Sequence, residues 1–529
     1  MQVPHDVVIV GGGHNGLVAA AYLARAGRKV LVLERRPVVG GPVVTEEIRP
    51  GFRCPSGAAL CGMFRREIVE DLRLVAHGLA FIPFDPPVIA MGEGSQALRL
   101  WREERRAQAE IARVSAADAA AYPKFRSLMM RIAAVLDPLL LSVPPSVESP
   151  KPGDEWFLLR RALRLRRLGK ETMFEALRLP FMSVRDGLNE WFESELLKAS
   201  FAMDALFGVF RGPWSPFTAF GLFHHFVAEV NGGWAFVRGG SGSLSSALAA
   251  AAQNAGVEIR TNAEVRRILS PEGRATGVEL VSGETIPARV VVSTADPKRT
   301  FLELADPLAL GADFLVRVRN YNSEGCVAKV NLALDAAPQI PTLGDGSFLP
   351  PRFRIAPNLE YIERAYDDAK HGDMSESPTL DVAIPSAVDT SLAPPGKHVL
   401  SILVQYTPYH LRKGTWEDRR EPLGERVLEI LADHVTNLRS IVVGMEVLTP
   451  ADLEARFGLS GGHIFHGEMT LNQQYVLRPV AGWGRYRTPI PGLYLCGSGS
   501  HPGGGITGAP GYNGARAILE DWRGIVRGA

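Results

Sequence analysis

The sequence contains few cysteines, and none of them are closely paired. Its 529 residues include four, Cys54, Cys61, Cys326 and Cys496. The absence of a Cys-X-X-Cys pair argues against a dithiol redox centre, and four widely spaced cysteines do not form a disulfide scaffold. We therefore expect a reducing compartment and predict a cytoplasmic protein.

An excess of charge and a long apolar run are also missing. Lysine and arginine number 58 and aspartate and glutamate 57, so no global field attracts nucleic acid, and we predict no nucleic-acid partner. The apolar stretch at 132–143 is interrupted by Asp137 and Pro138 and is shorter than the roughly 20 residues that cross a bilayer. Only five residues precede Asp6, so we expect no signal or transit peptide.

What is present is typical of a globular enzyme that acts on small molecules. Hydrophobic residues make up 46% and charged residues 22% of the chain. A chain of this length forms roughly two to four domains.

The beginning of the chain predicts a dinucleotide-binding βαβ unit. An apolar run at 7–10 leads into Gly-Gly-Gly-His-Asn-Gly at 11–16, an alanine-rich helix pattern and a second apolar run that ends at Glu34. Gly11 allows the tight turn, Gly13 lets backbone amides approach a pyrophosphate, and Gly16 lets the helix pack on the strand. The Glu34 carboxylate suits ribose hydroxyls. The alternative is a chance glycine-rich turn.

Two further glycine motifs bear on this unit. Gly40 and Gly41 follow the second strand and suggest another close approach of backbone to a ligand, with a plain turn as the alternative. The glycine-rich loop at 239–242 is followed by Ser245 at the position of the third glycine of the motif. This argues against a second dinucleotide site for NADPH. The chain is instead expected to return to the first domain, with strands near 257–260, 264–269, 277–281 and 288–293.

The two regions between these motifs differ in character. Residues 65–238 are mostly helical in pattern, and Trp156, Leu159 and Leu163 fall on a different helical face from the nearby arginines. This stretch, 156–170, is either a basic amphipathic helix on a lipid surface or a solvated arginine face over a core stripe. Residues 311–480 have alternating runs at 327–334, 379–384 and 398–405, which predict an antiparallel sheet with one face lining a substrate cavity.

Two segments near the end of the chain concentrate polar groups. The stretch 461–469 includes His463, His466 and Glu468, which are either reactive groups or loop residues satisfied by hydrogen bonds. No third ligand lies at a diagnostic spacing, so we predict no metal site. The tail predicts a strand at 492–496, a glycine loop at 497–505 and a helix at 506–520. Two polar-ligand sites at opposite ends of the chain suit one long ligand.

Taken together, these motifs resemble those of one flavoenzyme branch over nearly the whole chain. The segments that carry the resemblance are 8–17, 40–41, 45–48, 291–299, 465–469 and 492–505. The chain resembles the phytoene desaturase and carotenoid isomerase-like branch of the FAD-linked amine oxidase superfamily, which includes pyridine nucleotide-disulphide oxidoreductase domain-containing proteins.

The resemblance implies FAD and an α/β fold in which a discontinuous Rossmann-like domain carries an inserted α+β substrate domain with a largely helical region. The expected FAD-binding segments are 1–90, 236–310 and 481–529, with a helical region at 91–235 and the substrate sheet at 311–480. A helix that begins near residues 505–506 is expected to point its positive end at the flavin. The implied cofactor-binding residues are Gly11, Gly13, His14, Asn15, Gly16, Glu34, Arg35, Gly40, Gly41, Val265, Gly497, Gly505 and Ile506.

The implied activity is oxidation at C–H bonds of a hydrophobic substrate, by desaturation or double-bond isomerisation of a polyene, a carotenoid-like compound or a lipid. His466, Glu468 and His501 are the candidate catalytic bases. Residues 52–57 lack the acidic residue common in phytoene desaturases, and the paired cysteines of a disulphide centre are missing. The alternatives are an amine or amino-acid oxidase and a non-catalytic flavoprotein. The electron acceptor, oxygen or a quinone, and the oligomeric state stay open.

Overall fold

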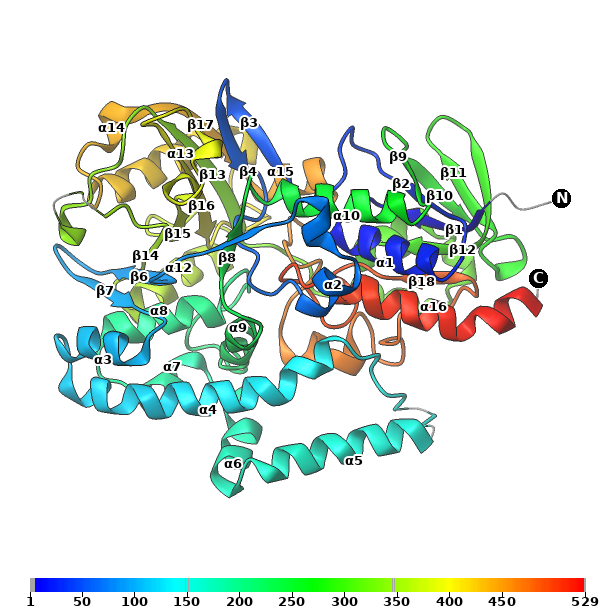
Figure 1. The fold of residues 1–529 in the computed structure, drawn as a ribbon, viewed down its shortest axis with the longest axis horizontal. Helices are drawn as coiled ribbons and strands as arrows, with labels where there is room; N and C mark the ends of the chain where they lie inside the picture. Colours follow the sequence, from blue (N-terminus) through cyan, green and yellow to red (C-terminus); the bar gives the residue numbers. More distant parts are fainter. Residues whose placement is uncertain (1–4, 148, 151, 345, 347, 528–529) are drawn as a thin grey trace.

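Two seven-stranded sheets organise the chain (Figure 1). The computed structural model describes residues 5–147, 149–150, 152–344, 346 and 348–527. In the first sheet the order is β10-β11-β12-β1-β2-β9, and β18 lies beside β12. Strands β18, β12, β1, β2 and β9 are parallel, whereas β10 and β11 are antiparallel. The strands are β1 (His5–Val10), β2 (Val30–Leu33), β9 (Glu258–Arg260), β10 (Val265–Leu269), β11 (Gly277–Leu280), β12 (Thr285–Ser293) and β18 (Leu493–Leu495).

Three helices cover one face of this sheet: α1 (His14–Arg25), α10 (Gly242–Asn254) and α16 (Ala509–Arg527). They bury Leu17, Leu248 and Ile518 in one apolar cluster with strand residues such as Val7 and Val32. Parallel strands need crossover connections, and these helices supply them or complete the layer. The predicted Rossmann-like sheet, assembled from separate parts of the chain, is confirmed.

The last helix begins later than predicted. We expected a helix at 506–520, but α16 starts at Ala509. Gly505, Ile506 and Gly508 have φ angles of 99°, 55° and 71°. A right-handed helix cannot pass through residues in the left-handed region, so the loop continues for three more residues. The helix terminus expected at residues 505–506 is therefore not there.

The second sheet has the order β17-β13-β16-β15-β14-β6-β7. All neighbours are antiparallel except β14 and β6. The predicted runs at 327–334, 379–384 and 398–405 correspond to β13, β15 and β16. The strands are β6 (Val88–Met91), β7 (Ala97–Leu100), β13 (Val327–Leu334), β14 (Arg352–Ile355), β15 (Thr379–Ala383), β16 (His398–Gln405) and β17 (Val442–Leu448).

Strands β6 and β7 come from a stretch that we predicted to be mostly helical. Ala90 pairs with Arg354 on β14, which joins residues 88–100 to the second sheet. The predicted domain limits, which include one at residue 90 within β6, remain predictions.

The faces of the second sheet differ. Val330, Phe353, Val382 and Ile402 point into an apolar core beneath α13 (Trp416–Ala432) and α14 (Leu438–Ile441). Successive residues of a strand point to opposite faces, so the residues between them face the other way. That other face carries polar and charged residues.

A helical layer packs below the second sheet in Figure 1 around a cluster that includes Phe125, Leu197 and Phe223. Its helices are α3 (Glu104–Ala112), α4 (Ala116–Leu140), α5 (Pro152–Arg167), α6 (Lys170–Arg178), α7 (Val184–Asn189), α8 (Glu195–Ala205), α9 (Phe220–Val230) and α12 (Leu359–Lys370). The remaining elements are α2 (Arg66–Asp71), α11 (Ala312–Arg319), α15 (Pro450–Phe457) and the hairpin and ribbon strands β3 (Thr45–Arg49), β4 (Phe52–Pro55), β5 (Phe81–Pro83) and β8 (Ala235–Val237).

The basic stretch at 156–170 forms α5 and the start of α6, and α5 lies at the edge of the molecule beyond α4 (Figure 1). None of its described residues is buried. Trp156, Leu159 and Leu163 are 43–55% exposed, so the interpretation as a core stripe is wrong. Among the described residues, no helix combines the length and apolar character needed to span a membrane.

Candidate functional site

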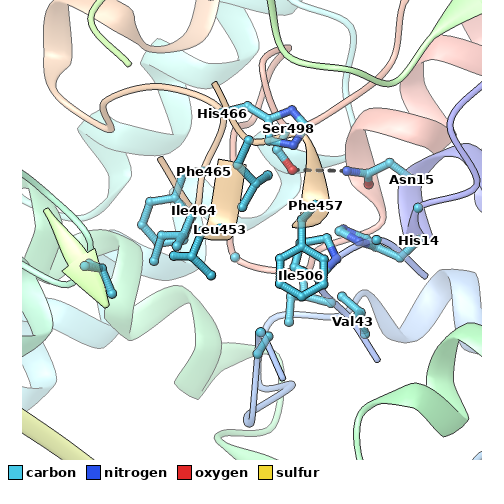
Figure 2. Close-up of a pocket in the computed structure, with 18 of the residues that line it drawn as sticks. His14, Asn15, Val43, Leu453, Phe457, Ile464, Phe465, His466, Ser498 and Ile506 are labelled. Atoms are coloured by element: carbon cyan, nitrogen blue, oxygen red, sulfur yellow. Dashed lines mark hydrogen bonds between the residues drawn. The ribbon is translucent and has the colours of Figure 1, made fainter. Parts of the chain in front are cut away.

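A cavity of about 290 Å³ runs between the two sheets. It begins at the glycine loop after β1 and passes His14 and Ile506 (Figure 2). From there it reaches the polar face of the second sheet. The first turn of α1, the glycine loop at 497–505 and the second sheet therefore line one continuous cavity.

The glycine loop leaves room for a ligand at one position and none at two others. A Cβ at Gly11 would lie 2.4 Å from Thr294 Oγ1, and one at Gly16 would lie 2.4 Å from the Gly11 carbonyl oxygen. A Cβ at Gly13 would meet no protein atom within 4 Å. Gly11 and Gly16 thus serve the packing of the turn, whereas Gly13 opens towards the cavity that it lines.

Glu34 is held at the end of β2 by two backbone amides. Gly12 N–H donates to Glu34 Oε2 at 2.8 Å, and Arg36 N–H donates to Oε1 at 2.9 Å. Its side chain lines the cavity and is 6% exposed. Arg35 and Val265 line the same end. A carboxylate fixed beside the glycine loop is placed to accept hydrogen bonds from a ribose.

The glycine pair has divided roles. Gly40 N–H donates to the Gly12 carbonyl at 2.8 Å, so this residue supports the first loop from outside the cavity wall. Gly41 lines the cavity. One residue of the pair thus supports, and the other lines, the end of the cavity beside Gly13 and Glu34, which we call the nucleotide end.

The C-terminal glycine loop at 497–505 contacts the first turn of α1 through Ser498. Asn15 Nδ2 donates to Ser498 Oγ at 3.2 Å (Figure 2). Ser498, Gly505 and Ile506 line the cavity. Gly497 is outside the lining, because it packs against Thr294, whose carbonyl oxygen would lie 2.3 Å from an added Cβ.

His466 is the candidate base that reaches the cavity. Burial, together with the charge of Arg478, lowers the pKa of His466 well below its ordinary value. Burial also lowers the pKa of His14 to about 3 and that of His224 to about 4, and both line the cavity. These imidazoles are therefore neutral at pH 7.

Glu468 and His501 are buried behind the cavity lining. Glu468 Oε1 accepts from Phe210 N–H at 2.7 Å, and His501 Nε2 lies 2.9 Å from the Leu139 carbonyl. Burial lowers the pKa of His501 to about 4. Neither residue is part of the described lining, so the structure brings only one of the three predicted bases to the cavity.

Sequence reasoning missed the charged face of the second sheet. It comprises the buried residues Lys329, Arg352, Arg354 and Asp381, which all line the cavity. Their signal was present in the runs Val-Ala-Lys-Val-Asn, Arg-Phe-Arg-Ile and Thr-Leu-Asp-Val-Ala, where polar residues alternate with apolar ones. In strands that are buried on both faces, such alternation marks a polar cavity wall.

Another part of the cavity lining is apolar. Phe207, Val209, Phe217, Phe220, Ile464, Phe465 and Met469 contribute to it. Ile464 and Phe465 lie beside Leu453 in Figure 2. The described residues contain no group of three or more histidine, cysteine, aspartate or glutamate side chains able to hold a metal ion. All four cysteines are free and buried.

The nucleotide end fits FAD. Gly13 leaves an open cradle, Glu34 presents a fixed carboxylate, and two buried polar atoms of lining residues, His14 Nε2 and Asn15 Oδ1, have no hydrogen-bond partner among the described residues. Buried polar groups normally have partners, so these atoms indicate that a polar ligand completes the site.

Comparison with known proteins agrees with this geometry. The sequence pattern of the flavin containing amine oxidoreductases matches residues 16–519. The pyridine nucleotide-disulfide oxidoreductase domain-containing protein 2 of Rattus norvegicus is 39% identical over 99% of this chain and 95% of its own. The hydroxyneurosporene desaturase of Cereibacter sphaeroides is 30% identical over 98% of both chains.

The fold also matches a solved oxidase structure. A putrescine oxidase variant superposes with a TM-score of 0.60 at 17% identity over 100% of both chains. The resemblance seen in the motifs is thus confirmed. Because the family pattern spans most of the chain, this protein belongs to the family of flavin-containing amine oxidoreductases and is an FAD-dependent oxidoreductase.

Proposed function

We propose that the protein removes hydrogen from a C–H bond of a largely apolar substrate and so desaturates it, with redox-neutral movement of a double bond as the alternative. The observation that carries this proposal is the continuous cavity, which joins the nucleotide end to a wall of aromatic and aliphatic side chains. Bound FAD supplies the hydride acceptor. The aromatic wall, which includes Phe207 and Phe465, orients an apolar chain and excludes water.

His466 is the residue placed to take the proton that leaves. Its buried imidazole has a lowered pKa and is neutral at physiological pH, and its Nδ1 has no partner among the described residues. A neutral imidazole accepts a proton without first losing one. Glu468 and His501 are separated from the cavity by its lining, so we assign them no proton transfer.

Oxidation of an amine is less well supported by the cavity. A cationic amine is recognised by a free carboxylate, whereas Asp204 and Asp381, the acidic side chains at the second sheet, are engaged by arginines. The hydrocarbon substrate is therefore the better fit. A flavoprotein without turnover would not need a neutral imidazole beside an apolar wall.

Anaerobic reduction of the bound flavin tests the activity. Lipid-dispersed polyenes or alkenes are expected to bleach the oxidised flavin bands, and amines are not. His466→Gln is expected to slow this reduction about 100-fold with the flavin content unchanged. Since the His466 pKa lies below its usual range, the wild-type rate should be flat from about pH 6 to 9 and fall only in more acidic solution.

His410→Gln is the control, because His410 is exposed and outside the cavity. Bleaching by amines with release of hydrogen peroxide would contradict the proposal and indicate an amine oxidase. Flavin that neither these substrates nor dithionite reduces would indicate a non-catalytic flavoprotein. An unchanged rate in His466→Gln would remove His466 from the mechanism.

We also propose that α5 rests on an anionic membrane surface from which an apolar substrate arrives. Half-buried Phe157, Arg161 and Leu165 face the body of the protein. The opposite face presents the exposed stripe of Trp156, Leu159 and Leu163, which is flanked by exposed Arg160, Arg164 and Arg167. An apolar stripe bordered along one side by cationic side chains suits insertion beside lipid phosphates.

Vesicle flotation tests this contact. The triple variant Trp156→Ser, Leu159→Ser, Leu163→Ser is expected to lose at least about tenfold in binding to phosphatidylcholine vesicles that contain phosphatidylserine, because three apolar side chains no longer insert. Leu308→Ser is the control, since Leu308 is 93% exposed on a different segment. Equal binding by the triple variant, or equal binding to purely neutral vesicles, would contradict the proposal.

A further inference from the structure

The charged face of the second sheet forms two adjacent rows. In the first row, Arg354 on β14 opposes Asp381 on β15, which opposes Leu403 on β16, which opposes Lys329 on β13. In the second row, Arg352 opposes Ala383, which opposes Ser401. Residues opposed in register share a face, so these side chains all point to the cavity that they line.

Most of the charges in these rows are paired with one another. Asp381 accepts from Nε and Nη2 of Arg352 and from Nε of Arg354. Asp204 on α8 accepts from Arg354 Nη2 and lies 3.1 Å from His225 Nδ1. Arg354 Nη1 donates to the Ser200 carbonyl at 3.2 Å. Both carboxylates and all three guanidinium nitrogens of Arg354 are thus engaged.

Three donors remain at this end of the cavity. Arg352 Nη1 and Trp234 Nε1 are buried and without partners among the described residues. The Arg352 guanidinium lies 5.6 Å from the centre of the Trp234 ring, so the two donors are neighbours. The Lys329 ammonium makes no hydrogen bond within the part of the chain that the structure describes.

The charge balance identifies the kind of group that would satisfy these donors. Arg352, Arg354 and Lys329 oppose Asp204 and Asp381, which leaves one positive charge. Glu446, which also acts on Lys329, is bound to Arg456 and to Asn331. Burial lowers the pKa of Lys329 to about 8, so its ammonium form predominates at pH 7. One excess positive charge beside planar donors matches a monoanion, and a carboxylate has that charge and shape.

We propose that Arg352 Nη1, Trp234 Nε1 and Lys329 Nζ bind the carboxylate of an otherwise apolar substrate, which makes the substrate a hydrocarbon acid. This inference rests on the proposed function and names the substrate class of the same cavity. The head group sits on the charged face of the second sheet, and the chain lies along the aromatic wall towards His466. A buried N–H group without a hydrogen-bond acceptor destabilises the folded protein, and a bound carboxylate supplies the missing acceptor.

Binding to the holoenzyme tests the inference, with oleate and methyl oleate as probes and the flavin spectrum as readout. We expect oleate to bind at least about tenfold more tightly than its ester, because only the acid carries the charge. Trp234→Phe keeps an aromatic side chain but removes the indole N–H donor, and it should weaken oleate binding about tenfold without affecting the ester. Lys329→Met should also remove most of the preference.

Trp101→Phe is the matched control, because Trp101 packs against Arg106 outside the cavity. Flavin content and thermal unfolding of each variant show that the fold is kept. Equal affinity for acid and ester, or equal weakening of both in Trp234→Phe, would overturn the inference. Preference for oleate without flavin reduction would sustain the inference and contradict the proposed function. Flavin reduction without a preference for oleate over its ester would sustain the proposed function and contradict the inference.

Discussion

Gly13→Val is expected to give a folded protein that retains less than about a tenth of the wild-type FAD. The φ of Gly13 is −66° and its ψ is 167°, which any residue adopts, and an added Cβ meets no protein atom within 4 Å. The apoprotein therefore has room for the valine. The same space is the cradle at the nucleotide end of the cavity, so the side chain excludes the pyrophosphate. The ratio of flavin to protein absorbance measures the loss.

Two other glycines give this experiment its reference points. Gly524→Val adds the same side chain where a Cβ also meets no atom, on an exposed face of α16, and should retain all FAD. Gly16→Ala places a Cβ 2.4 Å from the Gly11 carbonyl and should destabilise the apoprotein as well. If Gly13→Val kept its flavin, the pyrophosphate would not lie at this loop.

Asp381→Ala is expected to destabilise the protein by about 3–5 kcal/mol. Asp381 is 7% exposed and is the shared acceptor of Arg352 and Arg354, each 2% exposed. Without the Asp381 carboxylate, two buried arginine side chains on one face of the second sheet lose their shared counter-ion. This is a large part of the roughly 5–15 kcal/mol that stabilises a folded protein. Urea unfolding, compared between variant and wild type, measures the difference.

The exposed pair of Glu360 and Arg364 on α12 supplies the contrast. These side chains are 62% and 76% exposed, so Glu360→Ala should cost less than about 0.5 kcal/mol. Combining Asp381→Leu with Arg352→Met should recover stability relative to Asp381→Ala, since one stranded cation is removed. A loss below about 1 kcal/mol in Asp381→Ala would mean that water reaches and solvates the arginines.

The nucleotide end was predictable from the sequence because its chemistry depends on local order. Gly11, Gly13 and Gly16 follow a strand and open a helix, and Glu34 ends the next strand, so adjacent residues meet in space. The same reasoning placed the helix after the tail loop three residues too early. The residue types did not reveal that Ile506 adopts a left-handed φ of 55°, which the surrounding loop imposes.

The substrate end was not predictable in the same way, because its residues meet only through strand pairing. Lys329 and Arg354 are distant in sequence, and β15 and β16 bring them into one row. The sequence of one strand does not reveal its register with its neighbours. The candidate bases show the same limit. Glu468 lies two residues from His466, and His501 belongs to the glycine loop at 497–505, yet both are buried outside the cavity lining.

The hydrogen bond between Asn15 and Ser498 also bears on how the protein is made. It joins residues 483 positions apart, and β18 at 493–495 completes the first sheet beside β12. Ser498 is synthesised 483 residues after Asn15. Until then, the first sheet lacks β18 and the nucleotide loop lacks its partner, so tight retention of FAD is expected only after Ser498 has left the ribosome. Completion of the nucleotide end therefore depends on late, non-local contacts.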